Sequence, residues 1–192
     1  MNALFPIFLR LRNRRALVVG GGAIATIRVK QLLAAQAAIT VIAPHATAEI
    51  KKLAANGSLQ LLRRQFERTD VDRSYFVVIG ATNKPSVQQA LAEEAERHGL
   101  LCNVVDQPAL CNFYTPAVIG RGNLKIAICT QGQSPAFSGR LRQALEEAIP
   151  DSAGEFTNLL GDLRQKLKET IPGNLKRQRE LLLEFIERAA SE

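Results

Sequence analysis

Three consecutive glycines follow a short apolar run near the start of the chain, and a helical pattern begins directly after them. Residues 16–25 read ALVVGGGAIA. Gly20, Gly22 and Ala25 thereby occupy the three small positions of a G-x-G-x-x-A fingerprint for dinucleotide binding. In this pattern Gly20 permits a tight turn, Gly22 lets a pyrophosphate approach the backbone, and Ala25 lets the helix pack closely on the strand. The motif predicts a strand, a turn and a helix whose free N–H groups hold a dinucleotide.

Apolar runs and helical patterns alternate through the first half of the chain. The expected strands and helices, in chain order, are residues 15–19, 23–35, 38–43, 47–55, 59–62, 75–81, 86–98 and 101–105. The strands among them are continuously apolar, which is typical of a parallel sheet covered on both faces. We therefore expect an α/β fold with a Rossmann-like, doubly wound parallel sheet over residues 1–112.

The rest of the chain has a different pattern. Residues 124–130 alternate like a half-exposed strand, and a helical pattern follows over residues 136–148. A strand pair and one helix cannot bury a core alone, so we expect residues 113–148 to be a small α+β dimerisation segment that completes its core with a second subunit. Residues 149–192 are expected to form a helical C-terminal domain in which Phe185 faces inward.

Composition limits the classes to which the chain can belong. Its 192 residues are 46% hydrophobic and 22% charged, which is typical of a globular protein. No apolar run approaches the roughly 20 residues of a membrane span, so we expect a cytoplasmic protein without a membrane segment. Three cysteines without metal-type spacing and only two histidines predict reduced thiols and no protein-built metal site.

The net charge of +7 is unevenly distributed along the sequence. Residues 1–48 and 107–145 contain several basic side chains and no acidic one. Such stretches suit a polyanionic small molecule, and a solvated basic surface is the alternative. Aromatic residues make up only 5% of the chain and no nucleic-acid-binding motif is present, so we do not expect a nucleic-acid partner.

Polar residues that follow expected strands are candidates for a ligand site, since doubly wound folds bind ligands at the carboxyl ends of their strands. Asp106 follows the last expected strand, where a carboxylate acts as a general base once a hydride has left. The alternative is an aspartate that caps a turn before Gln107 and Pro108. Thr82 follows residues 75–81, where it either approaches the cofactor or caps a turn or a helix.

Two further segments leave alternatives open. After the second expected strand, Pro44 and His45 stand where NAD-selective fingerprints carry an acid, and no arginine stands there to bind a 2′-phosphate. The sequence pattern therefore does not decide between NAD and NADP. Residues 130–135 form a loop with hydroxyl groups and free backbone donors, which either binds carboxylates or simply connects a strand to a helix.

An ordered set of motifs resembles the siroheme-synthase family. In chain order the motifs are PIFL at residues 6–9, VVGGG at 18–22, CNVVDQP at 102–108, Phe113, Pro116, IAICTQGQSP at 126–135 and Arg142. The resemblance implies NAD-dependent dehydrogenation of precorrin-2 to sirohydrochlorin, on the route to siroheme or cobalamin, by a homodimer joined through the middle segment. One alternative is a bifunctional dehydrogenase and sirohydrochlorin ferrochelatase. Another is a non-catalytic module that senses NAD(H).

The resemblance also implies roles for particular residues. Asp106 matches the family's essential aspartate, Thr130 matches a hydroxyl near the tetrapyrrole substrate, and Ser134 and Pro135 match its Ser-Pro loop. Together with the glycine motif and the strand ends, the resemblance gives these expected cofactor-binding residues: Gly20, Gly22, Ala23, Ile24, Pro44, His45 and Thr82. Asn83 and Lys84 are a departure, because many family members carry two aspartates there.

Overall fold

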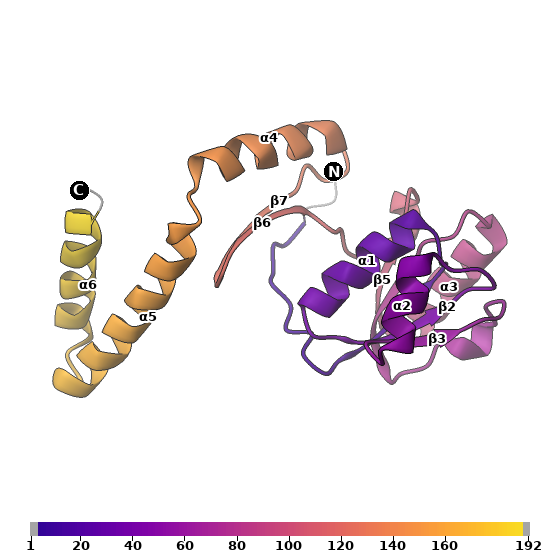
Figure 1. Cartoon of the computed structure of the whole chain (residues 1–192), viewed down its shortest axis with the longest axis horizontal. Helices are drawn as coiled ribbons and strands as arrows, with labels where there is room; N and C mark the ends of the chain where they lie inside the picture. The colour runs from indigo at the N-terminus through magenta and orange to yellow at the C-terminus, as the bar shows by residue number, and fades with distance from the viewer. Residues whose placement is uncertain (1–3, 190–192) are drawn as a thin grey trace. The chain divides into compact units, whose positions relative to one another are not determined.

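The structure is a computed structural model that describes residues 4–189. It contains two compact units, Met1–Thr115 and Pro116–Glu192 (Figure 1). Within the described residues, no helix is both long enough and apolar enough to cross a bilayer.

The first unit is a five-stranded parallel sheet with helices packed on both faces (Figure 1). Its strands lie in the order β3-β2-β1-β4-β5. Its elements are β1 (Arg15–Val19), α1 (Ala23–Ala34), β2 (Ala38–Ile42), α2 (Ala48–Ala55), β3 (Gln60–Leu62), β4 (Tyr75–Gly80), α3 (Pro85–Arg97) and β5 (Leu101–Val104), with short 3-10 turns at Arg68–Asp70 and Pro108–Leu110. The predicted doubly wound sheet is confirmed.

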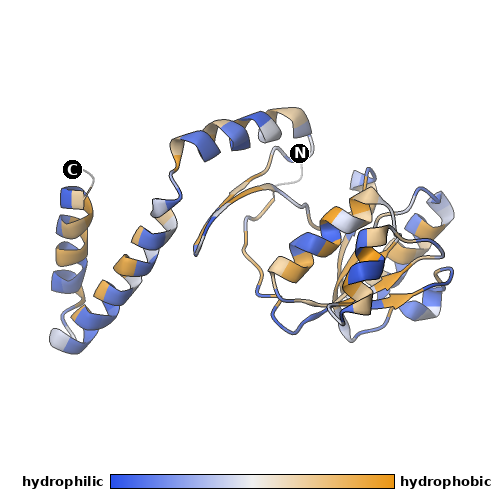
Figure 2. Cartoon of the chain, viewed as in Figure 1, coloured by the Kyte–Doolittle hydropathy of each residue, from blue (hydrophilic) through white to orange (hydrophobic). Residues whose placement is uncertain are grey.

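Successive residues of the central strands point to opposite faces of this sheet, and each face has its own core. The core beneath α1 and α2 includes Ala16, Val18, Ala25, Val29, Ile39, Val41, Ile50, Val77 and Ile79. The core beneath α3 includes Leu17, Val19, Ile42, Val78, Leu91, Ala95, Cys102 and Val104. Because both faces are covered, the strands are apolar along their whole length, and Figure 2 shows them in the hydrophobic colour.

The second unit combines a strand pair with three helices. Its elements are β6 (Ala117–Arg121), β7 (Leu124–Ile128), α4 (Pro135–Ala148), α5 (Ser152–Thr170) and α6 (Leu175–Ala189). The two strands are antiparallel, and Ile119 in β6 is 1% exposed where α4 and α5 pack against the strands. The Arg121 side chain donates hydrogen bonds to the carbonyl oxygens of Glu146 (2.9 Å) and Ile149 (3.1 Å), which fixes β6 to the end of α4.

The helical tail buries less of its apolar surface than the sequence pattern predicted. Phe185 of α6 stacks on Phe156 of α5 with ring centroids 6.2 Å apart, yet Phe185 stays 36% exposed. The prediction that Phe185 faces inward is therefore wrong in part, because a two-helix hairpin covers only one side of each helix. Leu159 and Leu175 are also exposed, at 50% and 75%.

Candidate functional site

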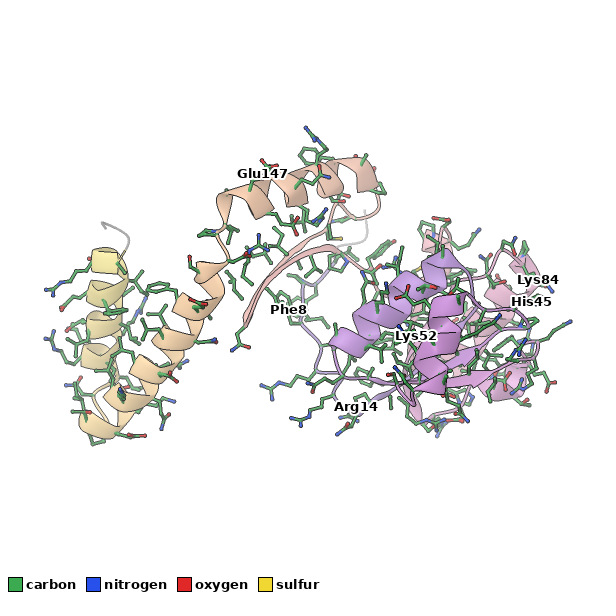
Figure 3. All side chains as sticks on the ribbon, in the orientation of Figure 1. Phe8, Arg14, His45, Lys52, Lys84 and Glu147 are labelled. Carbon is green, nitrogen blue, oxygen red and sulfur yellow. The ribbon has the colours of Figure 1, made fainter. Side chains whose placement is uncertain are left out.

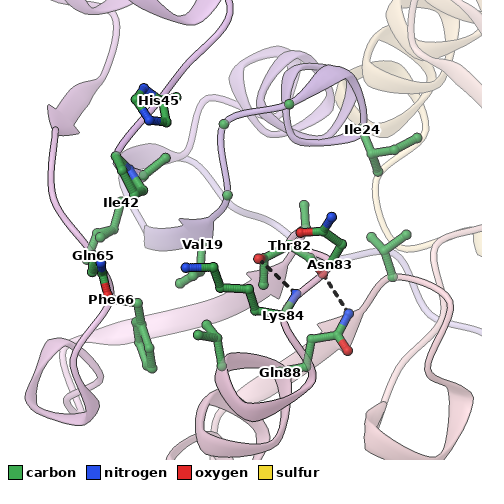
Figure 4. Close-up of a pocket in the computed structure, with 18 of the residues that line it drawn as sticks. Val19, Ile24, Ile42, His45, Gln65, Phe66, Thr82, Asn83, Lys84 and Gln88 are labelled. Carbon is green, nitrogen blue, oxygen red and sulfur yellow. Dashed lines mark hydrogen bonds between the residues drawn. The ribbon is translucent and has the colours of Figure 1, made fainter.

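A pocket of about 670 Å³ lies at the carboxyl end of the first unit's sheet (Figure 4). The chain leaves β1 for β2 and β3 on one side and returns to β4 on the other, so the strand order reverses between β1 and β4. The helices that follow these two strands pack on opposite faces of the sheet, and a crevice opens between their loops. The pocket is lined by residues that follow each of the five strands.

The three glycines at the end of β1 meet different surroundings. Gly20 has a φ of +122°, and a Cβ built on it would lie 2.1 Å from the Ala81 carbonyl oxygen after β4. A Cβ on Gly21 would lie 2.2 Å from the His45 carbonyl oxygen after β2. A Cβ on Gly22 would meet no atom within 4 Å. Gly20 and Gly21 therefore stand where the backbones of Ala81 and His45 leave no room for a side chain. Gly22 instead leaves open space beside the backbone.

The amino end of α1 has no negative group to satisfy it. Gly22 is the N-cap residue, so no side chain accepts a hydrogen bond from the first turn, and that turn contains no acidic residue. The first N–H groups of a helix lack partners within the helix and carry a partial positive charge. An open space beside such a helix start fits the diphosphate of a dinucleotide, which is the ligand that the glycine pattern predicts.

The loop between β4 and α3 forms another wall of the pocket. The Thr82 hydroxyl accepts a hydrogen bond from the Lys84 backbone N–H at 3.3 Å, and the Thr82 carbonyl accepts one from the buried Gln88 amide at 2.6 Å (Figure 4). Thr82 therefore caps a turn and also lines the pocket. The turn-capping role is therefore observed, and contact of Thr82 with a cofactor stays a prediction.

Asp106 lies in a tight turn at the end of β5 and lines the same pocket. Its φ is +60°, a conformation that aspartate and asparagine adopt more readily than other residues with side chains. Within residues 4–189 its carboxylate forms no hydrogen bond or ion pair, so the turn-capping alternative is not observed there. Burial lowers the pKa of Arg28 on α1, and the negative charge of Asp106 opposes that shift, so the two groups interact electrostatically.

The turn that carries this aspartate is fixed to the edge of the sheet. The side-chain amide of Asn112 forms hydrogen bonds with the backbone at the outer edge of β5. It accepts a hydrogen bond from the Cys102 N–H (2.7 Å) and donates one to the Leu100 carbonyl (2.8 Å). The Val104 N–H donates to the Cys111 sulfur at 3.2 Å. Burial raises the pKa of the Cys102 thiol to about 12 and also raises that of Cys111. These thiols are packing groups that hold the turn in place.

The Ser-Pro loop belongs to the second unit and is not part of this pocket. The Thr130 hydroxyl accepts from the Ser134 N–H, and the Ser134 hydroxyl accepts from the Phe137 N–H, each at 3.3 Å. Ser134 is the N-cap of α4 and Pro135 its first residue. Gln131 in this loop has a φ of +54°.

Comparison with known proteins agrees with this geometry. A family model described as putative NAD(P)-binding matches residues 7–117. The siroheme synthase of Methylococcus capsulatus is 43% identical over 157 residues, and siroheme synthase 1 of Aeromonas hydrophila is 38% identical over 156 residues. These alignments cover 82% and 81% of this chain but 33% and 34% of those proteins, so the chain spans about a third of their length.

A solved structure of SirC, a precorrin-2 dehydrogenase, superposes over 95% of this chain and 89% of its own with a TM-score of 0.78 and 34% identity. The chain belongs to the siroheme-synthase and precorrin-2 dehydrogenase family. The resemblance found in the sequence is thereby confirmed. The superposition shows that the two proteins share one fold.

The structure gathers into one pocket the side chains that the sequence and the family resemblance assigned to the cofactor. Every residue expected to bind the cofactor lines this pocket, and Asp106 lines it too. The residues expected to bind the cofactor are Gly20, Gly22, Ala23, Ile24, Pro44, His45 and Thr82. Thr130, Ser134 and Pro135, assigned to the substrate, lie in the other unit. Among the described residues no three His, Cys, Asp or Glu side chains are grouped to bind a metal ion.

Several lining residues were not found from the sequence. They are Gly21, Gln65, Phe66, Asn83, Lys84, Val87, Gln88 and Gln107, among others. Gly21 could have been found because it stands within the triple glycine. Lys84 could have been found because it departs from the pattern of the family at that position. Gln65 and Phe66 follow the short edge strand β3 in an irregular segment, which has no periodicity that sequence analysis can use.

Proposed function

We propose that this chain catalyses the NAD-dependent dehydrogenation of precorrin-2 to sirohydrochlorin. The observation that carries the proposal is the unpaired Asp106 carboxylate in the same pocket as the glycine loop. The similarity to a solved precorrin-2 dehydrogenase supplies the substrate. The pocket fits the cofactor, because Gly22 leaves space at an uncapped helix start where a diphosphate would be bound by backbone N–H groups.

The chemistry assigned to the protein's own groups is proton transfer and electrostatic stabilisation. Nicotinamide dinucleotide, when bound, accepts the hydride that leaves the tetrapyrrole. As the hydride leaves, positive charge develops on the macrocycle, and the Asp106 carboxylate stabilises that charge. Asp106 then accepts the proton that the macrocycle must also lose, which completes a two-electron oxidation. The hydrogen-bonded edge at Asn112 keeps this carboxylate in position.

The charge pattern supports a polycarboxylate substrate. Residues 1–48 and 107–145 contain no acid, and each unit contributes to these stretches. We assign the loop of Thr130, Ser134 and Pro135 to substrate binding on the strength of the family resemblance. Val118 and Phe137 are 45% and 61% exposed on the segment that we assign to a homodimer interface. The three free thiols suit a cytoplasmic location.

The direct test uses purified protein, precorrin-2 and NAD⁺ under anaerobic conditions. Absorbance at the NADH band and the visible bands of sirohydrochlorin report the two products. Asp106→Asn keeps the left-handed turn accessible and removes the charge, so we expect turnover to fall by about 10²–10⁴-fold while nucleotide affinity is retained. Asp162→Asn, on the exposed surface of α5, is the matched control with unchanged rate.

Two outcomes decide against the proposal. Full activity in Asp106→Asn would remove Asp106 from its role, and the absence of NADH with the unaltered protein would remove the dehydrogenase assignment. A parallel reaction with sirohydrochlorin, ferrous iron and no nucleotide tests the bifunctional alternative. Tight NAD binding without any turnover of precorrin-2 would favour the NAD(H)-sensing module instead.

A further inference from the structure

One wall of the pocket is a loop that follows the edge strand β3. Gln65 and Phe66 of this loop line the pocket, and Figure 4 shows both on the same side as Ile42 at the end of β2. His45 and Lys84 also line the pocket, and they lie at the same end of the first unit in Figure 3. In dinucleotide folds the adenosine ribose binds at the end of the second strand. Because β3 lies beside β2, this loop borders the adenosine half of a bound dinucleotide.

Residues 64–70, here called the 64–70 loop, are closed into one piece by hydrogen bonds. The Asp70 carboxylate accepts hydrogen bonds from the Arg64 guanidinium and from the Glu67 N–H, the latter at 2.8 Å. Arg64 also donates to the Gln65 carbonyl oxygen at 3.0 Å. These contacts join the two ends of the loop, so the position of the residues between them depends on how the whole loop is anchored.

A single arginine anchors the 64–70 loop to α3 by ion pairs. Arg68 donates hydrogen bonds to the Glu94 carboxylate at 3.1 Å and to the Glu93 carboxylate at 2.6 Å. Within residues 4–189 no other ion pair joins this loop to α3. The Glu94 side chain is 5% exposed, so its charge requires partners. Arg97 of the same helix supplies the second partner, at 3.0 Å.

The helix that holds this anchor also forms part of the pocket. Val87 and Gln88, near the start of α3, line it. Phe66 and Val87 pack against the same apolar core, the one beneath α3, and Phe66 is half-buried there. Arg68 therefore connects the helix that carries one wall of the pocket to the loop that carries another. Its ion pairs fix where the Phe66 ring lies relative to Val87.

We propose that Arg68 is a positioning residue for nucleotide binding, whose ion pairs with α3 hold Phe66 against the adenosine half of the dinucleotide. The inference rests on the proposed function only in that a dinucleotide occupies the pocket. Arg68 itself does not line the pocket, so it acts through the loop. The Phe66 ring supplies apolar contact to the nucleobase. Loss of the anchor weakens that contact and leaves the Asp106 end of the pocket unchanged.

The test measures the affinity for NAD⁺ without tetrapyrrole, by isothermal titration calorimetry. We expect Arg68→Gln to raise the Kd by about three- to tenfold. The turnover of precorrin-2 at saturating NAD⁺ should stay within about twofold, because only binding is affected. Arg97→Gln is the matched control, since it removes the other partner of Glu94 without releasing the loop, and it should leave the Kd unchanged. Lys52→Gln, on the exposed side of α2 outside the pocket, controls for the loss of one positive charge (Figure 3).

A double-mutant cycle separates positioning from a general structural role. Phe66→Ala should itself raise the Kd by about tenfold, as for a lost contact between an aromatic ring and a base. In the Phe66→Ala background, Arg68→Gln should add almost nothing, because the arginine acts through that ring. Glu93→Gln removes one of the two ion pairs and leaves Glu94 with both arginines. It should weaken binding in the same direction by a smaller factor, which keeps the inference testable if Arg68→Gln does not fold.

Three results would overturn the inference. One is an unchanged Kd in Arg68→Gln, and another is an equal rise of the Kd in Arg97→Gln. The third is a full, additive loss from Arg68→Gln in the Phe66→Ala background. In each case the proposed function stands, because the unaltered protein still binds NAD⁺. Failure of the unaltered protein to bind NAD⁺ would overturn the inference and the proposed function together.

Discussion

Replacement of Gly22 by serine separates nucleotide binding from folding. The added Cβ meets no atom within 4 Å, and the backbone at φ −82° and ψ −168° is open to any residue. Serine is also at least as good an N-cap as glycine. We therefore expect the free energy of unfolding of Gly22→Ser to stay within about 0.5 kcal/mol of the unaltered value.

The same substitution should nearly abolish nucleotide binding. The new side chain occupies the space beside the helix start, and its hydroxyl accepts from the N–H groups that a diphosphate needs. Loss of two hydrogen bonds to a charged phosphate, at about 1.5–3 kcal/mol each, amounts to about 3–6 kcal/mol. The Kd for the nucleotide should then rise by roughly 10²- to 10⁴-fold.

Calorimetric titration with each nucleotide and thermal unfolding by circular dichroism measure the two effects on one sample. Gly161→Ser on α5 is the matched control, because a Cβ there also meets no atom within 4 Å, and its nucleotide affinity should not change. Binding by Gly22→Ser within about threefold of the unaltered affinity, with an unchanged melting temperature, would refute the placement of the diphosphate at this helix start.

Other substitutions and reagents test the surrounding structure. Gly20→Ala should lower the free energy of unfolding by about 2–6 kcal/mol, because its φ and the contact of 2.1 Å with a backbone oxygen each cost about 1–3 kcal/mol. Gly99 has a φ of +67° but open space around it, so Gly99→Ala should lower the free energy of unfolding by only about 1–2 kcal/mol in the same denaturant titration. Gly139→Ala, in the helix interior of α4 with open space around it, should gain about 0.5–1 kcal/mol. Iodoacetamide near pH 9 should alkylate exposed Cys129 and spare Cys102, whose pKa burial raises to about 12, as read by intact mass. Because the folded state holds the Cys102 proton more tightly than the unfolded chain does, the free energy of unfolding should fall as the pH rises above about 9.

The sheet of the first unit could be predicted because its strands are buried on both faces. Each strand from β1 to β5 begins and ends within one residue of its expected bounds. The start of α2 could also be predicted, because its N-cap residue is Thr47, whose hydroxyl accepts a hydrogen bond from the Ile50 N–H. The position of Asp106 at a strand end likewise placed it in the pocket, since topology brings the ends of parallel strands together.

The remaining features depend on contacts that no local pattern specifies. Lys84 reaches the pocket because the loop after β4 turns there, and Asn112 finds the edge of β5 from a segment without periodicity. In the helical tail, the amphipathic pattern of α6 identified Phe185 as apolar but not what covers it. The structure gives it one ring partner, Phe156, and leaves the rest of its surface exposed.

The most direct measurement is the amount of reduced nucleotide formed per precorrin-2 consumed, without oxygen, in the unaltered protein and in Gly22→Ser. One reduced nucleotide should appear for each sirohydrochlorin formed, and Gly22→Ser should form both more slowly, by about tenfold or more, at nucleotide concentrations that just saturate the unaltered protein. Sirohydrochlorin that forms without reduced nucleotide, or at an equal rate in Gly22→Ser, would contradict hydride transfer to a nucleotide held on the glycine loop.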